Sequence, residues 1–226
     1  MEITFLGHAS LLLETGDSKL LVDPFISGNK LADGKVDIET LQPDFILLTH
    51  AHQDHSLDVE TIAARTGALI ISNFEIATYY GKKGLKSHPM NHGGAWQFPF
   101  GRLKYVNALH TSSFADGTYG GQPGGFVVEA AGKCVYIAGD TALTLDMKLI
   151  PMVFKLDLAV LPIGDNFTMG PSDAVMAADF VECDRILGYH YDTFGYIEID
   201  KEKAQKLFRD AGKELLLPAI GETINI

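Results

Sequence analysis

Short apolar runs recur along the chain, and turn residues or amphipathic stretches separate them. In the first half, this pattern predicts strands at residues 3–6, 10–14, 19–22, 44–48 and 68–72, and helices at 57–66 and 74–80. The run at 44–48 is assigned to a buried strand because Pro43, just before it, bars a helix. Gly67 and Gly81 follow the two helices, as glycines often do at helix ends. Such a succession of strands and helices is typical of α/β layers.

The second half repeats this alternation without visible sequence similarity to the first half. Residues 81–101 are rich in glycine, lysine and turn signals, so we predict a loop there. Beyond it, the pattern predicts strands at 103–109, 125–130, 133–138, 157–161, 185–189, 215–217 and 223–226, and helices at 173–181 and 201–211. Ser172 and Asp200 are the expected N-caps of those helices. Residues 116–125 hold five glycines and a proline, which indicates a mobile loop.

The composition is that of an ordinary globular protein. At 226 residues, with 46% hydrophobic and 21% charged residues, the chain fits one domain over residues 1–226. The net charge of −11 argues against a nucleic-acid partner, because phosphate binding needs clustered Lys and Arg. No apolar stretch reaches the roughly 18 residues of a membrane span and no export signal is visible, so we expect no membrane insertion and a cytoplasmic location. Two unclustered cysteines, Cys134 and Cys183, fit buried thiols in a reducing compartment.

The densest chemistry lies directly after the strand at 44–48, where His50, His52, Asp54 and His55 fall within six positions. Residues two apart on an extended chain point the same way, so His50 and His52 can reach one metal ion together. If the chain then bends into a helix, Asp54 and His55 can serve a second ion. Imidazole and carboxylate together suit zinc, manganese or iron. A solvated polar loop is the alternative, but open α/β sheets place ligand sites at such strand ends.

The stretch His50-Ala51-His52-Gln53-Asp54-His55 resembles the HxHxDH signature of the metallo-β-lactamase superfamily. Further motifs are similar to those of the small UPF0173-type metal-dependent hydrolases, in the branch that includes ascorbate-6-phosphate lactonase and N-acyl phosphatidylethanolamine phospholipase D. They are Gly7-His8-Ala9-Ser10, Ala138-Gly139-Asp140-Thr141, Leu161-Pro162-Ile163-Gly164 and His190-Tyr191-Asp192-Thr193-Phe194. The resemblance covers nearly the whole chain. It implies a four-layer αββα sandwich of the α/β class, with metals at one edge between two sheets.

The same resemblance assigns seven ligand-type residues. They are His50, His52 and His110 for one ion, Asp54, His55 and His190 for a second, and Asp140, which bridges both. The expected cofactors are two divalent metal ions, zinc first, with manganese and iron as alternatives. Asp54 and His8 are the catalytic candidates, His8 as a proton shuttle or a support for a ligand; a structural role is the alternative for His8. Gly188-Tyr189 replaces an expected Pro-Met before His190, a departure that concerns the pocket wall.

Three further residues are assigned to substrate binding. Ser112 and Ser113, beside His110, can bind a substrate oxygen or serve a plain turn. Asp192 stands in the pocket wall, where the family pattern has Asn. His92 could reach the pocket, but it is not assigned to the site. A phosphodiester would need cations, and the clustered candidates, which a solvated loop also explains, are Lys82, Lys83, Lys86 and Arg102.

The expected reaction is hydrolysis of an ester, lactone or phosphodiester bond in a small-molecule substrate, by a hydroxide that bridges two metal ions. Two divalent ions lower the pKa of water from about 16 towards 7 and polarise the bond under attack. The alternative is a non-catalytic metal-binding scaffold or binding module on the same fold. An oxygen-reducing di-iron protein is disfavoured because His52 stands where such proteins typically carry Glu. Family relatives often self-associate, so a homo-oligomer stays open.

Overall fold

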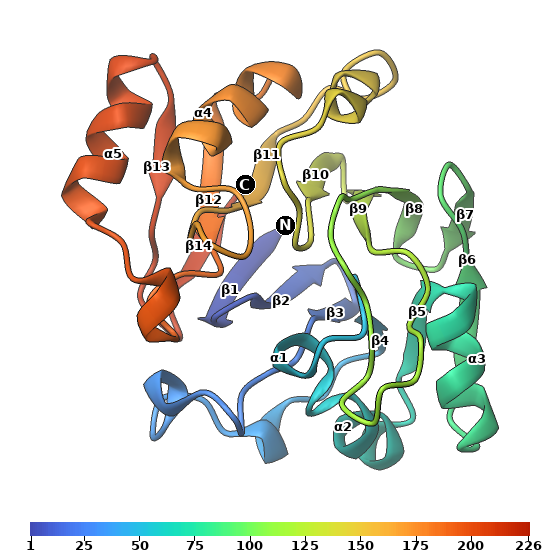
Figure 1. Cartoon of the computed structure of the whole chain (residues 1–226). Helices are drawn as coiled ribbons and strands as arrows, with labels where there is room; N and C mark the ends of the chain where they lie inside the picture. Colours follow the sequence, from blue (N-terminus) through green and yellow to red (C-terminus); the bar gives the residue numbers. More distant parts are fainter.

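Two seven-stranded sheets lie face to face in the computed structural model, which describes residues 1–226 (Figure 1). The first sheet contains, in spatial order, β14 (Thr223–Asn225), β1 (Glu2–Gly7), β2 (Ser10–Thr15), β3 (Ser18–Val22), β4 (Phe45–Leu47), β5 (Leu69–Asn73) and β6 (Ser87–Met90). The second contains β13 (Glu214–Leu216), β12 (Arg185–Tyr189), β11 (Leu158–Pro162), β10 (Lys133–Ile137), β9 (Gly124–Ala130), β8 (Gly101–Asn107) and β7 (Ala95–Phe98). The C-terminal β14 pairs with β1 and so completes the sheet that the N-terminal half forms.

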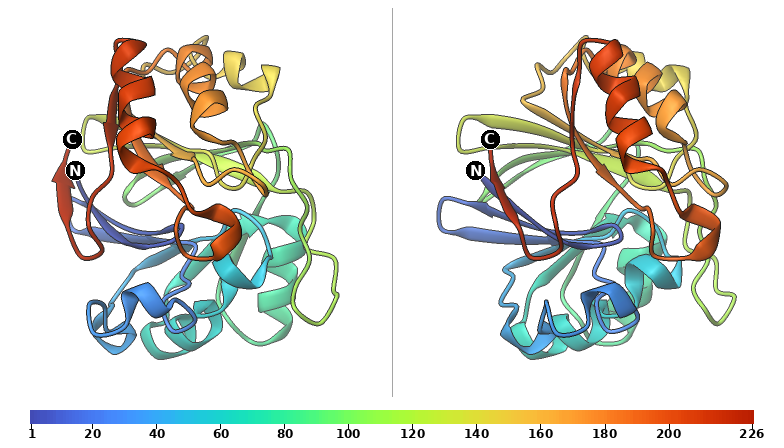
Figure 2. Two further views of the ribbon diagram at one scale, coloured as in Figure 1. Left: turned by 60° about the vertical axis from the view of Figure 1, so that its left-hand side comes forward. Right: turned by 90° about the vertical axis from the view of Figure 1, so that its left-hand side faces the viewer.

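Helices cover the outer face of each sheet, so the molecule has four layers, as the two views of Figure 2 show. The first sheet is covered by α2 (Val59–Thr66) and α3 (Phe74–Lys82), and the second by α4 (Pro171–Phe180) and α5 (Lys201–Asp210). The connections contain α1 (Gln53–Ser56) and the 3₁₀ helices η1 (Lys30–Ala32), η2 (Ile38–Thr40), η3 (Leu145–Leu149) and η4 (Gly195–Ile197). The predicted αββα sandwich is confirmed.

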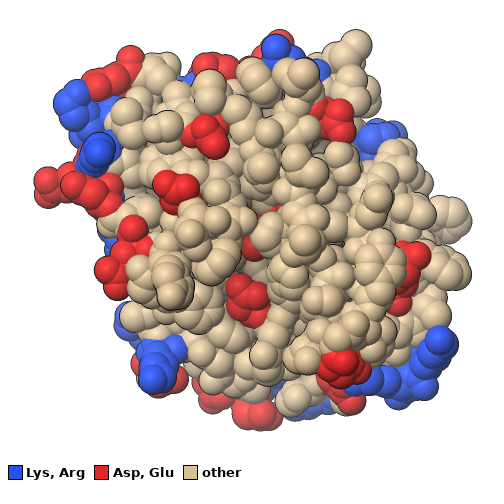
Figure 3. Space-filling model, in the orientation of Figure 1, with Lys and Arg blue, Asp and Glu red and all other residues tan.

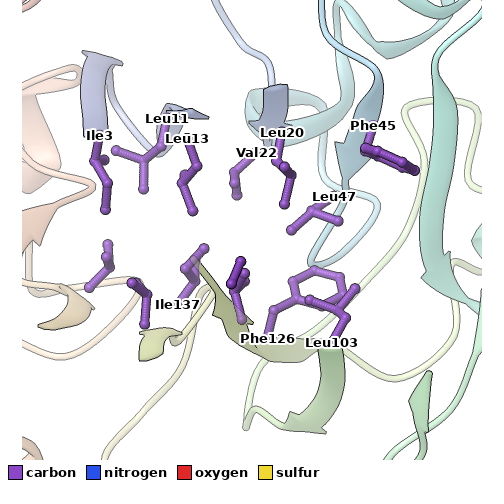
Figure 4. Close-up of a cluster of buried hydrophobic side chains, with 14 of the residues drawn as sticks. Ile3, Leu11, Leu13, Leu20, Val22, Phe45, Leu47, Leu103, Phe126 and Ile137 are labelled. Atoms are coloured by element: carbon purple, nitrogen blue, oxygen red, sulfur yellow. The ribbon is translucent and has the colours of Figure 1, made fainter. Parts of the chain in front are cut away.

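The space between the sheets is filled by a cluster of 24 buried side chains. On β3, Leu20 and Val22 point into this core, while Leu21 between them packs under the helices of the first sheet. Figure 4 shows Leu20 and Val22 pointing toward the opposite sheet, where Phe126 and Ile137 lie. Successive side chains of a strand alternate between its two faces, and here both faces are covered. This is why the strands read as continuous apolar runs in the sequence.

The strands that end in candidate site residues all run toward one edge of the sandwich. In the first sheet, β1 and β3 flank the antiparallel β2, and β4 is parallel to β3. In the second sheet, β8 and β10 flank the antiparallel β9, and β11 and β12 continue parallel to β10. The residues that follow these strands are therefore collected at one place. They are His8, Asp23, His50, His110, Asp140 and His190.

Several element boundaries differ from the predicted ones. The helix predicted at 57–66 begins at Val59, and the separate turn α1 precedes it. Helix α3 continues past Gly81, and Gly84, with φ of 82°, takes the left-handed conformation after it. The loop predicted at 81–101 contains β6 and β7. Both are edge strands, one with Pro89 and the other largely exposed, so neither has the apolar pattern of a buried strand.

Candidate metal centre

Three groups of potential ligand atoms meet at the edge where these strands end, and one of them, Asp23, His50 and His55, spans the other two. The first group consists of His50, His52 and His110, whose ligand atoms all lie within 4.8 Å of one another. The second consists of His8, Asp54, His55 and His190, within the same limit. The structure thus brings together the two sets that the sequence suggested, and adds His8 to the second.

Asp140, which follows β10, lies between the two groups. Its Oδ2 is 3.0 Å from His190 Nε2 and 3.4 Å from His55 Nε2 in the second group. The same oxygen is 3.6 Å from His110 Nε2 and 3.9 Å from His50 Nε2 in the first group. The side chain is almost fully buried. A carboxylate within reach of both groups is what a pair of ions needs as a shared ligand.

Several buried polar atoms at the centre of the site lack hydrogen bonds within the protein. His55 Nε2, Asp140 Oδ1 and His190 Nε2 are buried without a hydrogen-bond partner, although His190 Nε2 is close to Asp140. Leaving a buried polar atom unsatisfied costs about 1–3 kcal/mol. Imidazole nitrogens and carboxylate oxygens form a donor set that suits zinc, manganese and iron. The residues present therefore fit divalent cations.

Asp23, which follows β3, fixes the orientation of His55. One Asp23 oxygen accepts from the backbone N–H of Thr49 at 2.8 Å, and the other accepts from the Thr49 hydroxyl at 2.7 Å. The second oxygen also lies 2.9 Å from His55 Nδ1. A proton on Nδ1 would face this carboxylate and leave Nε2 free to bind a cation. Sequence reasoning missed Asp23, because Asp-Pro after a strand has the appearance of an ordinary turn.

His8 connects the second group to the loop after β12. Its Nε2 lies 3.1 Å from Asp54 Oδ2, and its Nδ1 lies 2.9 Å from the Thr193 hydroxyl. Burial, together with the neighbouring His190, lowers the pKa of His8 to about 4. His8 and His190 both have positive φ, 54° and 56°, and the backbone N–H of His190 donates to His8 O at 2.8 Å. This hydrogen bond connects the segments that follow β1 and β12, and so joins the two sheets at the metal centre.

Carboxylates dominate the electrostatics of the second group. Burial opposes charge on His55, but Asp140, Asp54 and Asp23 hold the pKa of His55 well above its ordinary value. Burial likewise opposes charge on His190, and Asp140 and Asp54 raise the pKa of His190 to about 9. In the first group, burial lowers the pKa of His50. The negative charge that favours cations is therefore concentrated around Asp140 and the second group.

The sequence matches a family model described as Beta-lactamase superfamily domain over residues 2–190. A UPF0173 metal-dependent hydrolase of Christiangramia forsetii is 66% identical over 226 residues, which cover 100% of both chains. The chain belongs to the UPF0173 family of the β-lactamase superfamily. A second relative, the UPF0173 metal-dependent hydrolase of Thermus thermophilus, is 48% identical over 214 residues and covers 95% of this chain and 94% of its own.

A solved structure supports the same relationship for this UPF0173 protein. Igni18, a metallo hydrolase from the hyperthermophilic archaeon Ignicoccus hospitalis, matches with a TM-score of 0.90 and 30% sequence identity. The match covers 99% of this chain and 97% of that chain. The fold implied by the HxHxDH resemblance is therefore borne out by sequence and structure alike. No helix of the UPF0173 protein combines the length and apolar character needed to cross a membrane.

The predicted substrate-binding residues differ in their availability. The Ser112 hydroxyl donates to Gly120 O at 3.0 Å and accepts from Ala51 N–H at 3.1 Å. It therefore joins the loop after β8 to the HxHxDH stretch at residues 50–55, which we call the metal motif. Ser113 is exposed. Asp192 accepts from the Ile199 N–H at 3.1 Å and forms an ion pair with a lysine, so both of its oxygens have partners in the protein. Of the three side chains, only that of Ser113 is exposed to solvent.

The glycine-rich loop at 116–125, predicted to be mobile, is fastened to its surroundings. The Asn73 side chain donates to Gly120 O at 2.7 Å and to Gln122 O at 3.1 Å. A Cβ at Gly120 would lie 2.3 Å from the Ala51 Cβ, so this glycine allows the loop to approach the metal motif closely. At least one of the glycines therefore serves close packing.

The remaining candidates of the sequence lie outside the two ligand groups. His92 Nε2 is 2.8 Å from Pro123 O, and its ring packs against a tyrosine. Lys83 pairs with Glu60, and Arg102 pairs with Glu129 at 2.9 Å. Arg102 lies at the start of β8, opposite the end that leads to His110. It lines a separate cavity of about 670 Å³.

Proposed function

We propose that this UPF0173 protein is a hydrolase with two divalent cations, zinc first and manganese or iron as alternatives, that cleaves an ester, lactone or phosphodiester bond in a small molecule. The observation that carries the proposal is the position of Asp140, whose Oδ2 lies within 3.9 Å of histidines from both ligand groups. A single ion would leave one of the two groups without a use. Bound divalent ions supply hydroxide at neutral pH and polarise the bond under attack.

Two sets of residues would hold these cations, one set for each. Three histidines would hold one cation, and Asp54, His55 and His190 the other, with Asp140 shared. The 2.9 Å contact with Asp23 occupies Nδ1 of His55 and would leave Nε2 to hold the cation. His8 holds Asp54 in position from the side opposite to solvent, because the His8 side chain is fully buried and Asp54 is partly exposed.

Metal content per chain tests the proposal. Elemental analysis of tag-free protein after zinc reconstitution should give close to two equivalents, and Asp140→Ala and His190→Ala should lower this number. Asp33→Ala and His88→Ala are matched controls, because both residues lie outside the ligand groups. The controls should retain wild-type content.

Turnover of p-nitrophenyl esters, simple lactones and p-nitrophenyl phosphodiesters by the loaded protein completes the test. One equivalent with full turnover would contradict the two-ion proposal. Content near zero after reconstitution, with no turnover, would contradict the enzyme as such and support the scaffold alternative. Full metal content without turnover of any of the three classes would also count against the hydrolase.

A further inference from the structure

Four large apolar side chains are exposed to solvent in the loops that carry the ligand-type residues or lie next to them. Leu109, Phe167, Phe194 and Tyr196, which we call the apolar rim, come from three different loops. Leu109 is 60% exposed, Phe167 52% and Tyr196 77%. Large apolar side chains exposed together next to a polar centre mark a binding surface.

The backbone places this rim directly beside the ligands. Leu109 precedes His110, and its carbonyl accepts from the Ala142 N–H at 3.1 Å. The carbonyl of Thr141, next to Asp140, accepts from the N–H of Met169 at 3.1 Å. That contact seats the loop that carries Phe167 against the centre. Leu109 and the loop of Phe167 are thus both hydrogen-bonded to residues 141–142, next to Asp140.

Aromatic contacts continue the rim around the second ligand group. The ring of Phe167 lies 6.1 Å from the ring of Tyr196, between centroids. Phe194 lies 5.4 Å from the ring of His8, which contacts Asp54. Asp165, in the loop before Phe167, has a positive φ of 63°, and such strained residues gather at binding sites. Phe167 and Tyr196 thus contact each other across two loops, and Phe194 contacts the second ligand group through His8.

The charges around the centre do not suit an anionic substrate. Every ion pair of Asp23, Asp54 and Asp140 is with a histidine. Figure 3 shows Lys and Arg only toward the margins of this face, while its middle carries uncharged atoms and a few acidic residues. Lys35 and Lys201 line a cavity of about 360 Å³ that His8 of the second group also lines, but Asp192 lies in the same cavity and pairs with Lys201 at 2.9 Å.

From these observations we infer that the substrate is an uncharged ester or lactone with an apolar acyl group, such as an alkyl chain or a phenyl ring, that packs on the apolar rim. This inference rests on the proposed hydrolase and narrows its substrate class. Phosphodiesters, which remain in the broader proposal, are disfavoured because none of the seven ligand-type residues pairs with a Lys or Arg, and because Lys201 in the cavity at His8 is already paired with Asp192. The acyl group would leave water on binding, and this contribution grows with its length.

A series of acyl esters tests the inference. For the zinc-loaded protein, kcat/KM should rise about tenfold or more from p-nitrophenyl acetate to the octanoate, and bis(p-nitrophenyl) phosphate should react at least about 100-fold more slowly than the octanoate. Phe167→Ala and Tyr196→Ala should lower kcat/KM for the octanoate several-fold more than for the acetate. Met152→Ala is the matched control for Tyr196→Ala, because both side chains are 77% exposed and Met152 lies outside the rim. It should leave the ratio of kcat/KM for the octanoate to that for the acetate unchanged.

Binding of octanamide, an uncharged amide, separates the inference from the proposed function. Saturation-transfer NMR should detect octanamide on the wild type, and the signal should weaken in Phe167→Ala. Octanamide binding that depends on the rim, without turnover of any ester, would overturn the hydrolase but keep the substrate class. Equal kcat/KM for the acetate, the octanoate and the phosphodiester, with no effect of the rim variants, would overturn the inference and keep the hydrolase. A dimer that both variants dissociate, with the octanoate-to-acetate ratio unchanged, would make the rim a subunit interface and overturn the inference.

Discussion

Asp23→Asn is a substitution of nearly equal size that removes a charge and one acceptor from the support of the metal centre. The side chain of Asp23 is buried, and its two oxygens serve three contacts, of 2.7, 2.8 and 2.9 Å. Asparagine offers one acceptor oxygen and one NH₂ donor. If the oxygen stays on the backbone N–H of Thr49, the NH₂ group faces His55 Nδ1. His55 must then carry its proton on Nε2, the nitrogen that would bind the cation.

The expected magnitude follows from this geometry. The opposite orientation of the amide would turn its NH₂ toward the Thr49 N–H, so two donors would face each other; neither arrangement satisfies all three contacts. Losing such a support for a metal-bound histidine lowers metal affinity or activity by about 10–100-fold. We expect the larger loss in the zinc equivalent that His55 would hold, because His55 contacts Asp23 directly, whereas His50 reaches Asp23 only through the Thr49 hydroxyl, which lies 3.0 Å from His50 Nδ1. The affinity of the first group, His50, His52 and His110, should therefore fall less than that of the second.

Zinc titration of the metal-free protein against a chromophoric chelator would measure both affinities. Nitrogen-15 chemical shifts of His55 would report its tautomer independently of the metal. Asp44→Asn is the matched control, because Asp44 also accepts from a backbone N–H, that of Lys19 at 2.9 Å, but is exposed and remote from the ligands. If folded Asp23→Asn bound both equivalents with wild-type affinity and kept the Nδ1–H tautomer of His55, the orienting role would be refuted.

Three further predictions concern stability. Gly120→Ala should lower the unfolding free energy by about 1–3 kcal/mol, since its Cβ would lie 2.3 Å from that of Ala51; urea unfolding measures this. Phe126→Ala, in the centre of the core, should cost about 3–5 kcal/mol by the same assay. Lys213 is nearly buried, and although burial opposes it, ion pairs with Asp179 and Asp184 raise the pKa of Lys213 above its ordinary 10.5. Its stabilising effect should be fully present below pH 10.5 and disappear as the pH rises through the raised pKa, so the stability difference between wild type and Lys213→Met should shrink in that range.

The sequence revealed the ligand-type residues because their signal is local. Each follows an apolar strand, and strands that run the same way bring their ends to one edge. His110 could therefore be grouped with His50, and His190 with His55, from strand order and family resemblance. Asp23 could not be found in this way, because its partners Thr49 and His55 are 26 and 32 residues away. No spacing rule joins an aspartate in a turn to a histidine at that distance. The pairing follows only from the parallel contact of β3 with β4.

The edge strands were missed for a related reason. Period-two apolar alternation signals a strand that buries one face, and unbroken apolar runs signal one that buries both. In β7, only Phe98 is buried, and its three preceding residues are exposed. In β6, Pro89 removes a donor, which an edge position tolerates. The loop at 116–125 shows the converse limit: glycine content indicated mobility, but the reason for Gly120 lies in its closeness to Ala51.

The metal centre is also the place where the fold accepts local cost. His8, Asp23 and His190 have left-handed backbone conformations that are unfavourable for residues other than glycine, by about 1–3 kcal/mol each. The buried nitrogen of His55 and the buried oxygen of Asp140 add unsatisfied polar atoms. These costs fall on one edge of a sandwich whose interior is a continuous apolar cluster, and the His190–His8 hydrogen bond holds the two sheets together there. A chain under selection for stability alone would relieve such strain with glycine, or with apolar residues in place of the unsatisfied ones. Their concentration around two converging ligand groups is accounted for by cation binding, which would satisfy these atoms and recover part of that cost.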